Sequence, residues 1–169
     1  MTEGLVIIVE GTDIVQEINT GGGPTGLARD SVGDIYVVQN SGQWGAPSSP
    51  VALLCRISGT SVEHIMDLPL TAPNDICFGP DGRLYITDPI SETALDEPSP
   101  GKVFALDLTS GVMELLSDDL LFPNGLAFDS CGQLYVAESF LGRIVRLTPS
   151  GSGGSTTEVI VSTLDGLPD

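Results

Sequence analysis

One sequence template occurs three times along this chain at nearly constant spacing. The copies are GPTGLARDSVGDIYVVQN from Gly23, APNDICFGPDGRLYITDP from Ala72 and FPNGLAFDSCGQLYVAES from Phe122. In each copy a glycine follows the proline by nine residues and a tyrosine follows it by twelve, which gives Gly33, Gly82, Gly132, Tyr36, Tyr85 and Tyr135. The prolines Pro24, Pro73 and Pro123 recur every 49 to 50 residues, and Pro168 opens a fourth copy. Such regularity requires a structure built from repeating units.

Each copy is predicted to contain four short strands. The clearest copy gives strands at 124–129, 133–138, 142–148 and 157–162, separated by turns that contain glycine or proline. The segments between the copies lack a helical period, and the 21 glycines and 12 prolines are spread along the whole chain. We therefore expect an all-β protein, a β-propeller with four-stranded blades.

The chain is expected to form one partial propeller domain, residues 1–169. Blades are predicted at 21–69, 70–119 and 120–164, and residues 165–169 begin a further blade. Residues 1–20 contain LVIIVE and DIVQEIN, which are predicted to be the outer two strands of a blade. Because propellers usually close with about four to eight blades, these roughly three and a half blades indicate a piece of a six- or seven-bladed protein. The alternative is that several copies assemble into one ring.

The charge of the chain excludes some classes of partner. It has 23 acidic and 6 basic residues, a formal charge of −17, so nucleic acids and anionic membrane surfaces would be repelled. The start, MTEGLVIIVEG, resembles neither a signal peptide nor a membrane span, and we expect a cytoplasmic protein. The three cysteines, Cys55, Cys77 and Cys131, form no CxxC pair and are expected to be buried thiols.

A polar residue follows the proline of every copy. The innermost strand of a propeller blade lines the central channel, so these residues are expected to point at one shared space; they are Thr25, Asn74, Asn124 and Asp169. All four carry side-chain oxygen, the donor that a hard divalent cation prefers. The alternative is local turn chemistry, because Asn and Asp are common in turns.

A second polar position lies fifteen residues after each proline, where the second strand ends. Its members are Gln39, Asp88 and Glu138. They are expected either to face a substrate or to be strand-end residues that meet solvent. Trp44, the single tryptophan, lies in a long following loop and is expected to anchor that loop by packing; the alternative is that it stacks on a sugar or lactone ring.

Several catalytic motifs are missing from the sequence. No GxSxG, Walker-type or HExxH motif occurs, and the single histidine, His64, lies outside the channel-facing positions of its strand. Histidine dyads and triads are therefore not expected within this stretch. Any hydrolysis here would need the help of a metal.

Three segments of the chain resemble the gluconolactonase, regucalcin and senescence-marker-protein (LRE-like) family of six-bladed β-propellers. They are APNDICFGPDGRLYITDP, GKVFALDLTSGVMELLSDDLLFPNGLAFDSCGQLYVAES and LPD. The resemblance covers about residues 23–169 and implies hydrolysis of sugar lactones with one divalent cation. Calcium is the first choice of cation, with zinc, magnesium or manganese as alternatives. It implies a monomer when the protein is complete, and self-association of a piece is an open alternative.

The resemblance also implies roles for individual residues. Asn124 matches the metal-binding Asn of the PNG motif, and Asp169 matches the Asp of the PDG motif, which would be both metal ligand and catalytic base for water. Asn74 and Thr25 match substrate-facing positions, and Asp88 joins them as a candidate substrate contact. The family's metal-binding Glu of an EGP motif has no counterpart, since neither EG pair is followed by proline.

Two other classes of protein share the looser repeat pattern. A non-catalytic propeller of the NHL type would bind a small ligand or a protein partner. A different propeller enzyme, similar to strictosidine synthase or streptogramin lyase, is the third alternative. The lyase is expected to use histidine, which His64 does not supply.

Overall fold

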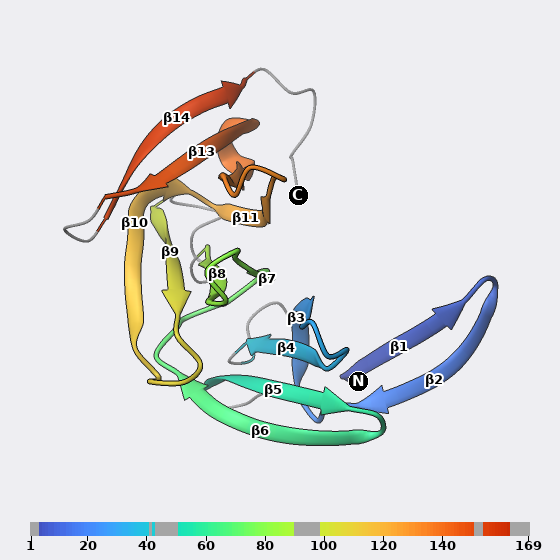
Figure 1. Cartoon of the computed structure of the whole chain (residues 1–169). Coiled ribbons are helices and arrows are strands. Elements are labelled where there is room, and N and C mark those ends of the chain that lie inside the picture. Colours follow the sequence, from blue (N-terminus) through green and yellow to red (C-terminus); the bar gives the residue numbers. More distant parts are fainter. Residues whose placement is uncertain (1–3, 41, 43–50, 90–98, 151–153, 163–169) are drawn as a thin grey trace.

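The computed structural model describes residues 4–40, 42, 51–89, 99–150 and 154–162, and most of these residues lie in β-strands (Figure 1). A short 3-10 helix, Ser139–Leu141, lies between two of the strands. The strands are β1 (Leu5–Glu10), β2 (Asp13–Asn19), β3 (Gly23–Arg29), β4 (Ile35–Asn40), β5 (Ala52–Ser58), β6 (Ser61–Leu68), β7 (Ile76–Phe78), β8 (Leu84–Asp88), β9 (Pro100–Leu106), β10 (Met113–Leu121), β11 (Pro123–Phe128), β12 (Leu134–Glu138), β13 (Arg143–Pro149) and β14 (Ser155–Val161).

The described strands form three four-stranded sheets and one two-stranded sheet, all antiparallel. Within each sheet every strand pairs with the next one in the sequence, in the orders β3-β4-β5-β6, β7-β8-β9-β10 and β11-β12-β13-β14. Figure 1 shows the sheets along an open arc, with β3, β7 and β11 toward its centre and β6, β10 and β14 at its rim. This is the arrangement of propeller blades, so the predicted fold class is confirmed. Strand β10 runs past the predicted blade limit at 119 to Leu121.

A glycine turn joins the first two strands of each blade. Gly33, Gly82 and Gly132 have φ of 101°, 81° and 78°, a backbone conformation that side-chain-bearing residues rarely adopt. In the first turn the Asp30 side chain accepts the Gly33 N–H at 2.8 Å, and in the third turn Asp129 accepts the Gln133 N–H at 2.9 Å. The glycine at offset nine is therefore required by the turn, and the turn sets where the second strand begins.

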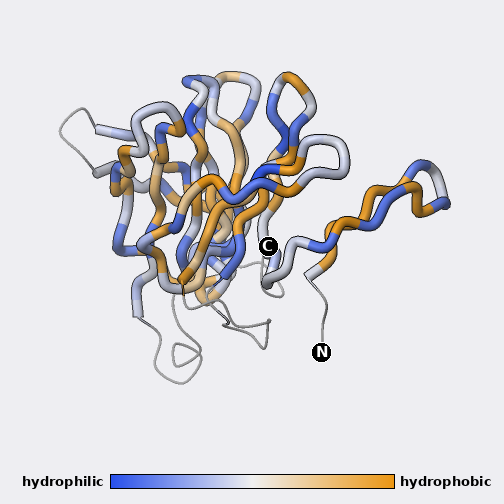
Figure 2. Tube along the Cα trace, turned by 90° about the horizontal axis from the view of Figure 1, so that it is seen from below, coloured by the Kyte–Doolittle hydropathy of each residue, from blue (hydrophilic) through white to orange (hydrophobic). Residues whose placement is uncertain are grey.

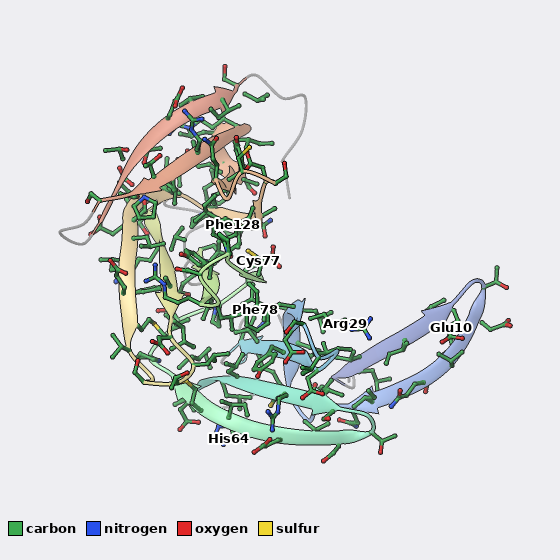
Figure 3. All side chains as sticks on the ribbon, viewed as in Figure 1. Glu10, Arg29, His64, Cys77, Phe78 and Phe128 are labelled. Carbon is green, nitrogen blue, oxygen red and sulfur yellow. The ribbon has the colours of Figure 1, made fainter. Side chains whose placement is uncertain are left out.

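Aromatic pairs join consecutive blades. The Tyr36 ring meets the edge of Phe78 with centroids 5.2 Å apart, and Tyr85 meets Phe128 at 4.8 Å. Figure 3 shows Phe78 and Phe128 in the spaces between neighbouring sheets, where the two main buried clusters lie. The tyrosine of one copy thus packs against the phenylalanine of the next copy. The repeated tyrosine is a packing residue between blades, which explains why its offset is constant.

The first two strands form a hairpin that extends from the rest of the molecule (Figure 2). Val6 and Ile18 of this hairpin are buried against Val37, Cys55 and Ile57 of the next sheet. Farther out, the side chains of Ile7, Val9, Ile14 and Val15 are 48% to 57% exposed. The hairpin therefore packs on the β3–β6 sheet only through its base.

The cysteine prediction is correct for Cys55 and wrong for Cys131. Cys55 is buried in β5, whereas Cys131 is exposed because it lies in the glycine turn between β11 and β12. Cys77 is partly buried in β7, where desolvation first and the nearby Asp75 second raise the pKa of its thiol to about 12. His64 lies in the outer strand β6 with its side chain 55% exposed (Figure 3), away from the centre as the sequence predicts. Trp44 lies outside the described residues.

Within the described ranges, no helix is long and apolar enough to cross a membrane.

Candidate functional site

Two of the predicted central residues, Asn74 and Asn124, line one pocket of about 460 Å³. Asn124 lies at the start of β11, and Asn74 lies in the turn that leads into β7, so both come from the innermost part of their blades. Asp75, Gly125 and Leu126 also line the polar end of the pocket. The sequence therefore predicts correctly that these two asparagines lie at one shared space.

The other side of the pocket is apolar. Ala127, Tyr135, Ala137 and Ile144 line it. The strand register places these four residues on one face of the β11–β14 sheet. Leu126 and Val136, which also line the pocket, belong to the opposite face and are buried against the preceding blade. Since β11–β14 ends the arc in Figure 1, this part of the pocket is a sheet face without a neighbouring blade in the described residues. We therefore assign only the polar end, at Asn74 and Asn124, to the candidate site.

Thr25 does not line the pocket. Its hydroxyl lies 2.9 Å from the Pro73 carbonyl oxygen and 3.3 Å from the Val38 carbonyl oxygen, and it can donate to either. Beside it, a Cβ on Gly26 would lie 2.6 Å from the Asn74 carbonyl oxygen, so only glycine allows this close backbone approach. Thr25 and Gly26 therefore hold the Asn74 turn against β3. Substrate binding by Thr25 stays a prediction.

Asp88 is a buried carboxylate with backbone partners. Its side chain accepts the Ala72 N–H at 2.6 Å and the Thr71 N–H at 3.0 Å, and the residue is 5% exposed. These bonds fix the segment that leads to Pro73 and Asn74. The two predicted roles for the strand-end polar residues were contact with a substrate and contact with solvent, and neither describes these backbone bonds. Substrate binding by Asp88 stays a prediction.

The corresponding side chains of the other two blades make similar bonds. Gln39 donates from Nε2 to the Thr20 carbonyl oxygen at 3.1 Å, and Glu138 accepts the Leu121 N–H at 2.7 Å. Both residues are no more than 1% exposed. The polar residue at the end of each second strand therefore anchors the segment before the innermost strand. The expectation that these residues meet solvent is wrong, because buried polar groups need partners and the connecting backbone supplies them.

Replacing Asp88 by alanine is expected to lower stability by about 2 kcal/mol, chiefly because the buried Ala72 N–H loses its acceptor. For a domain of this size the melting temperature should fall by roughly 4–8 °C, measured by thermal unfolding. Asp67→Ala is the control, since its carboxylate is 64% exposed and bonds His64 on the outer strand. An unchanged melting temperature with weaker ligand binding would instead assign Asp88 to the substrate.

Phe122 has an unusual backbone conformation beside the site. Its φ of 58° is the one positive value among non-glycine residues in the described ranges. The Phe122 ring stacks on Phe140 with centroids 4.7 Å apart, and the Phe122 carbonyl oxygen accepts the Ser139 N–H at 3.1 Å. A bulky residue in this region costs about 1–3 kcal/mol. The ring stack and the backbone bond stabilise this conformation immediately before Pro123 and Asn124.

Sequence reasoning missed two residues of the site, Asp75 and Thr87. Asp75 lines the pocket, and its two carboxylate oxygens accept the N–H groups of Ile76 and Leu126, both at 2.9 Å. The Thr87 hydroxyl donates to the Asn124 carbonyl oxygen at 2.8 Å. Both residues stand next to positions that the repeat singles out, Asn74 and Asp88. The sequence did contain a signal for them, because only the middle copy of the repeat has Asp and Thr at these two positions.

The donors at the polar end fit a hard cation in type. Asn74 and Asn124 offer amide oxygens, which calcium and magnesium accept along with carboxylates and water. The Asp75 carboxylate is already bonded to two backbone N–H groups. The described residues contain no group of three or more His, Cys, Asp and Glu side chains placed to hold a metal. The carboxylate ligand that the sequence predicts, Asp169, lies outside the described residues.

The sequence matches the model of the family described as SMP-30/Gluconolactonase/LRE-like region over residues 12–169. Among curated proteins, it is 28% identical over 170 residues to the adipocyte plasma membrane-associated protein Hemomucin of Drosophila melanogaster. That match covers 93% of this chain and 29% of the Drosophila protein. The chain thus spans less than a third of the length of this relative.

Solved structures share the fold. A gluconolactonase from Xanthomonas campestris superposes with a TM-score of 0.68 at 20% identity, over 93% of this chain and 54% of that one. Virginiamycin B lyase from Staphylococcus aureus superposes with a TM-score of 0.63 at 18% identity, over 92% of this chain and 48% of the lyase. At these identities the likeness concerns the fold alone. The described part of the chain corresponds to about half of either structure.

Proposed function

The chain belongs to the SMP-30/gluconolactonase/LRE-like family, and from this premise we propose that the protein is a divalent-cation-dependent lactonase that hydrolyses sugar lactones. The proposed site is the polar end of the pocket, at Asn74 and at Asn124 of β11. One observation carries the proposal: asparagines at equivalent positions of two consecutive copies of the repeat line the same pocket. The similar Xanthomonas campestris structure is that of a gluconolactonase, which supports the class of substrate.

The chain's own residues supply binding and orientation. Asn124 and Asp169 would hold the cation, and the Asn74 side chain would accept from or donate to the hydroxyl groups of the lactone. Calcium fits these oxygen donors best, with zinc, magnesium or manganese as alternatives. When bound, the cation would supply a Lewis acid for the lactone carbonyl.

Hydrolysis also needs a proton acceptor for the attacking water. Asp169 is our candidate, as the sequence resemblance implies, and its position lies outside the described residues. Asp75 is a poorer candidate, because both of its carboxylate oxygens already accept backbone N–H groups.

The test is hydrolysis of glucono-1,5-lactone, followed by acid release at constant pH. Chelation with EDTA is expected to reduce the rate to that of the uncatalysed reaction, and added calcium should restore it. Potassium chloride at the same ionic strength serves as the control for a general salt effect. A rate that exceeds the uncatalysed one equally with and without the cation would reject the proposed mechanism.

A second candidate is a non-catalytic propeller that binds a small ligand or a protein partner, or one similar to strictosidine synthase. It is favoured by the engaged carboxylate of Asp75, since no other carboxylate lines the described pocket. Calcium binding by calorimetry without any hydrolysis of lactones would support it. Cation-dependent hydrolysis that is lost on mutation of Asn124 would exclude it.

A further inference from the structure

The segment that carries Asn74 and the start of β11, which carries Asn124, are tied together by a closed set of hydrogen bonds. The Asp75 N–H donates to the Thr87 hydroxyl oxygen at 3.0 Å, and that hydroxyl donates to the Asn124 carbonyl oxygen at 2.8 Å. The Leu126 N–H donates back to the Asp75 carboxylate at 2.9 Å. We call this set the Asp75–Thr87 clamp. It joins the segment that carries Asn74 to β11 through the two residues that flank Gly125, Asn124 and Leu126.

Thr87 is held rigidly within this clamp. Its N–H donates to the Asp75 carbonyl oxygen at 3.1 Å, and its carbonyl oxygen accepts the Asn74 N–H at 2.9 Å. The residue is 0% exposed, so water does not compete for its hydroxyl. A hydrogen bond in such a buried place is electrostatically stronger than one in water. The Thr87 main chain thus bonds the segment that carries Asn74, while its side chain bonds Asn124 at the start of β11.

The Asp75 side chain is equally constrained. One carboxylate oxygen accepts the N–H of Ile76, its own neighbour, and the other accepts the N–H of Leu126 from the next blade. Bonds at both oxygens fix the rotation of the carboxylate. The group therefore acts as a rigid bridge between β7 and β11.

The clamp is not a general feature of the repeat. Two residues after the prolines, the three copies have Gly26, Asp75 and Gly125, and fourteen residues after them they have Val38, Thr87 and Ala137. Only the middle copy carries the carboxylate and the hydroxyl together. Blade packing alone does not require the pair, since the β3–β6 sheet packs against the β7–β10 sheet without it. The pair occurs at the junction where both asparagines line one pocket.

We propose that Thr87 and Asp75 are positioning residues that fix the separation and orientation of the Asn74 and Asn124 side chains for binding a divalent cation. This inference rests on the proposed function for the identity of the ligand. The coupling of the segment that carries Asn74 to the start of β11 does not depend on that function. The two halves are therefore tested by separate measurements.

The first measurement is the calcium dissociation constant, obtained by calorimetry on the whole chain. Thr87→Val keeps the shape of the side chain but removes both hydrogen bonds of the hydroxyl, and we expect calcium binding to weaken by about 10- to 100-fold. Thr87→Ser restores the hydroxyl and is expected to bind as the parent does. Asp75→Asn, which replaces one of the two carboxylate acceptors by an amide NH2 donor, should also weaken binding.

Thr20→Val is the matched control. The Thr20 hydroxyl also donates to a carbonyl oxygen, that of Gly4 at 2.9 Å, and Thr20 does not line the pocket. This variant is expected to lower the melting temperature while leaving calcium affinity unchanged. If Thr20→Val and Thr87→Val weaken calcium binding equally, the effect is one of stability and the proposal is overturned.

The second measurement is hydrogen exchange of the Leu126 amide in the absence of calcium. Thr87→Val and Asp75→Asn are expected to speed this exchange, and Thr87→Ser and Thr20→Val are not. If the parent binds no calcium, the proposed function fails. Faster exchange in Thr87→Val and Asp75→Asn would then still support the coupling of the Asn74 segment to β11. Unchanged exchange in both Thr87→Val and Asp75→Asn would overturn the clamp whether or not calcium binds.

Discussion

Asn124→Ala is expected to lower kcat/KM for glucono-1,5-lactone by at least about 100-fold, equivalent to roughly 2.7 kcal/mol of transition-state stabilisation. The reason is that Asn124, which lines the pocket at the start of β11, is our proposed neutral oxygen ligand of the cation. In the proposed site, losing one oxygen ligand would weaken binding of the cation, which would supply the Lewis acid for the lactone carbonyl. Initial rates at several calcium concentrations measure the effect, and calorimetry on the same variant measures the loss of cation affinity.

Two further variants separate this role from turn chemistry. Asn124→Asp keeps an oxygen donor and is expected to bind calcium at least as tightly as the parent. Asn19→Ala is the matched control, because the Asn19 side chain accepts the Gly21 N–H at 2.8 Å in a turn outside the pocket. If Asn124→Ala and Asn19→Ala had the same small effect on kcat/KM, Asn124 would be a turn residue and the lactonase proposal would lose its main support.

Glu138→Ala is expected to lower the free energy of unfolding by about 3 kcal/mol, the largest stability effect that we predict for a polar residue. Glu138 is 0% exposed and has two partners, the Leu121 N–H at 2.7 Å and the Arg143 guanidinium at 2.5 Å. The alanine variant would leave a part-buried guanidinium unpaired, its side chain being 29% exposed, and a backbone N–H without this acceptor. Chemical denaturation with an unchanged m-value would measure the loss.

The control for this variant is Glu158→Ala. Glu158 also bonds an arginine of the neighbouring strand, Arg146, but its side chain is 60% exposed on the outer strand β14. Exposed ion pairs contribute about 0–1 kcal/mol, so this variant should be close to the parent. Glu138→Gln, which keeps an acceptor for Leu121 but loses the charge, is expected to fall between the two. Equal losses for Glu138→Ala and Glu158→Ala would show that burial does not matter at this position.

Much of the fold follows from the sequence, because its determinants are local. The glycine at offset nine is needed for the backbone angle of each turn, and Gly33, Gly82 and Gly132 all have a positive φ. Alternation of apolar residues then places the strands, so that four antiparallel strands could be predicted for each copy. The constant tyrosine offset also has a simple cause, since Tyr36 and Tyr85 pack against the next copy.

The sequence predicts that Asn74 and Asn124 share one space, and both residues line one pocket, while their binding roles stay predictions. Asn74 and Asn124 follow equivalent prolines, and equivalent positions of neighbouring blades meet at the centre of the arc. The roles of Asp169 and of the cation remain predictions, because they lie outside what the described residues show. The buried environments of Gln39, Asp88 and Glu138 were not predicted, since the partners of strand-end residues cannot be read from alternation.

What only the tertiary structure decided is how one blade holds the next. The Thr25 hydroxyl bonds a carbonyl 48 residues away, Thr87 reaches Asn124 across 37 residues, and Asp75 reaches Leu126 across 51. Such partners are chosen by the packing of whole sheets, which brings distant backbone groups within hydrogen-bond distance, and no local pattern encodes that distance. The sequence by itself determined the repeating unit and which residue types stand at its centre. The packing of the blades determined which of those residues share a pocket and which hold the pocket together.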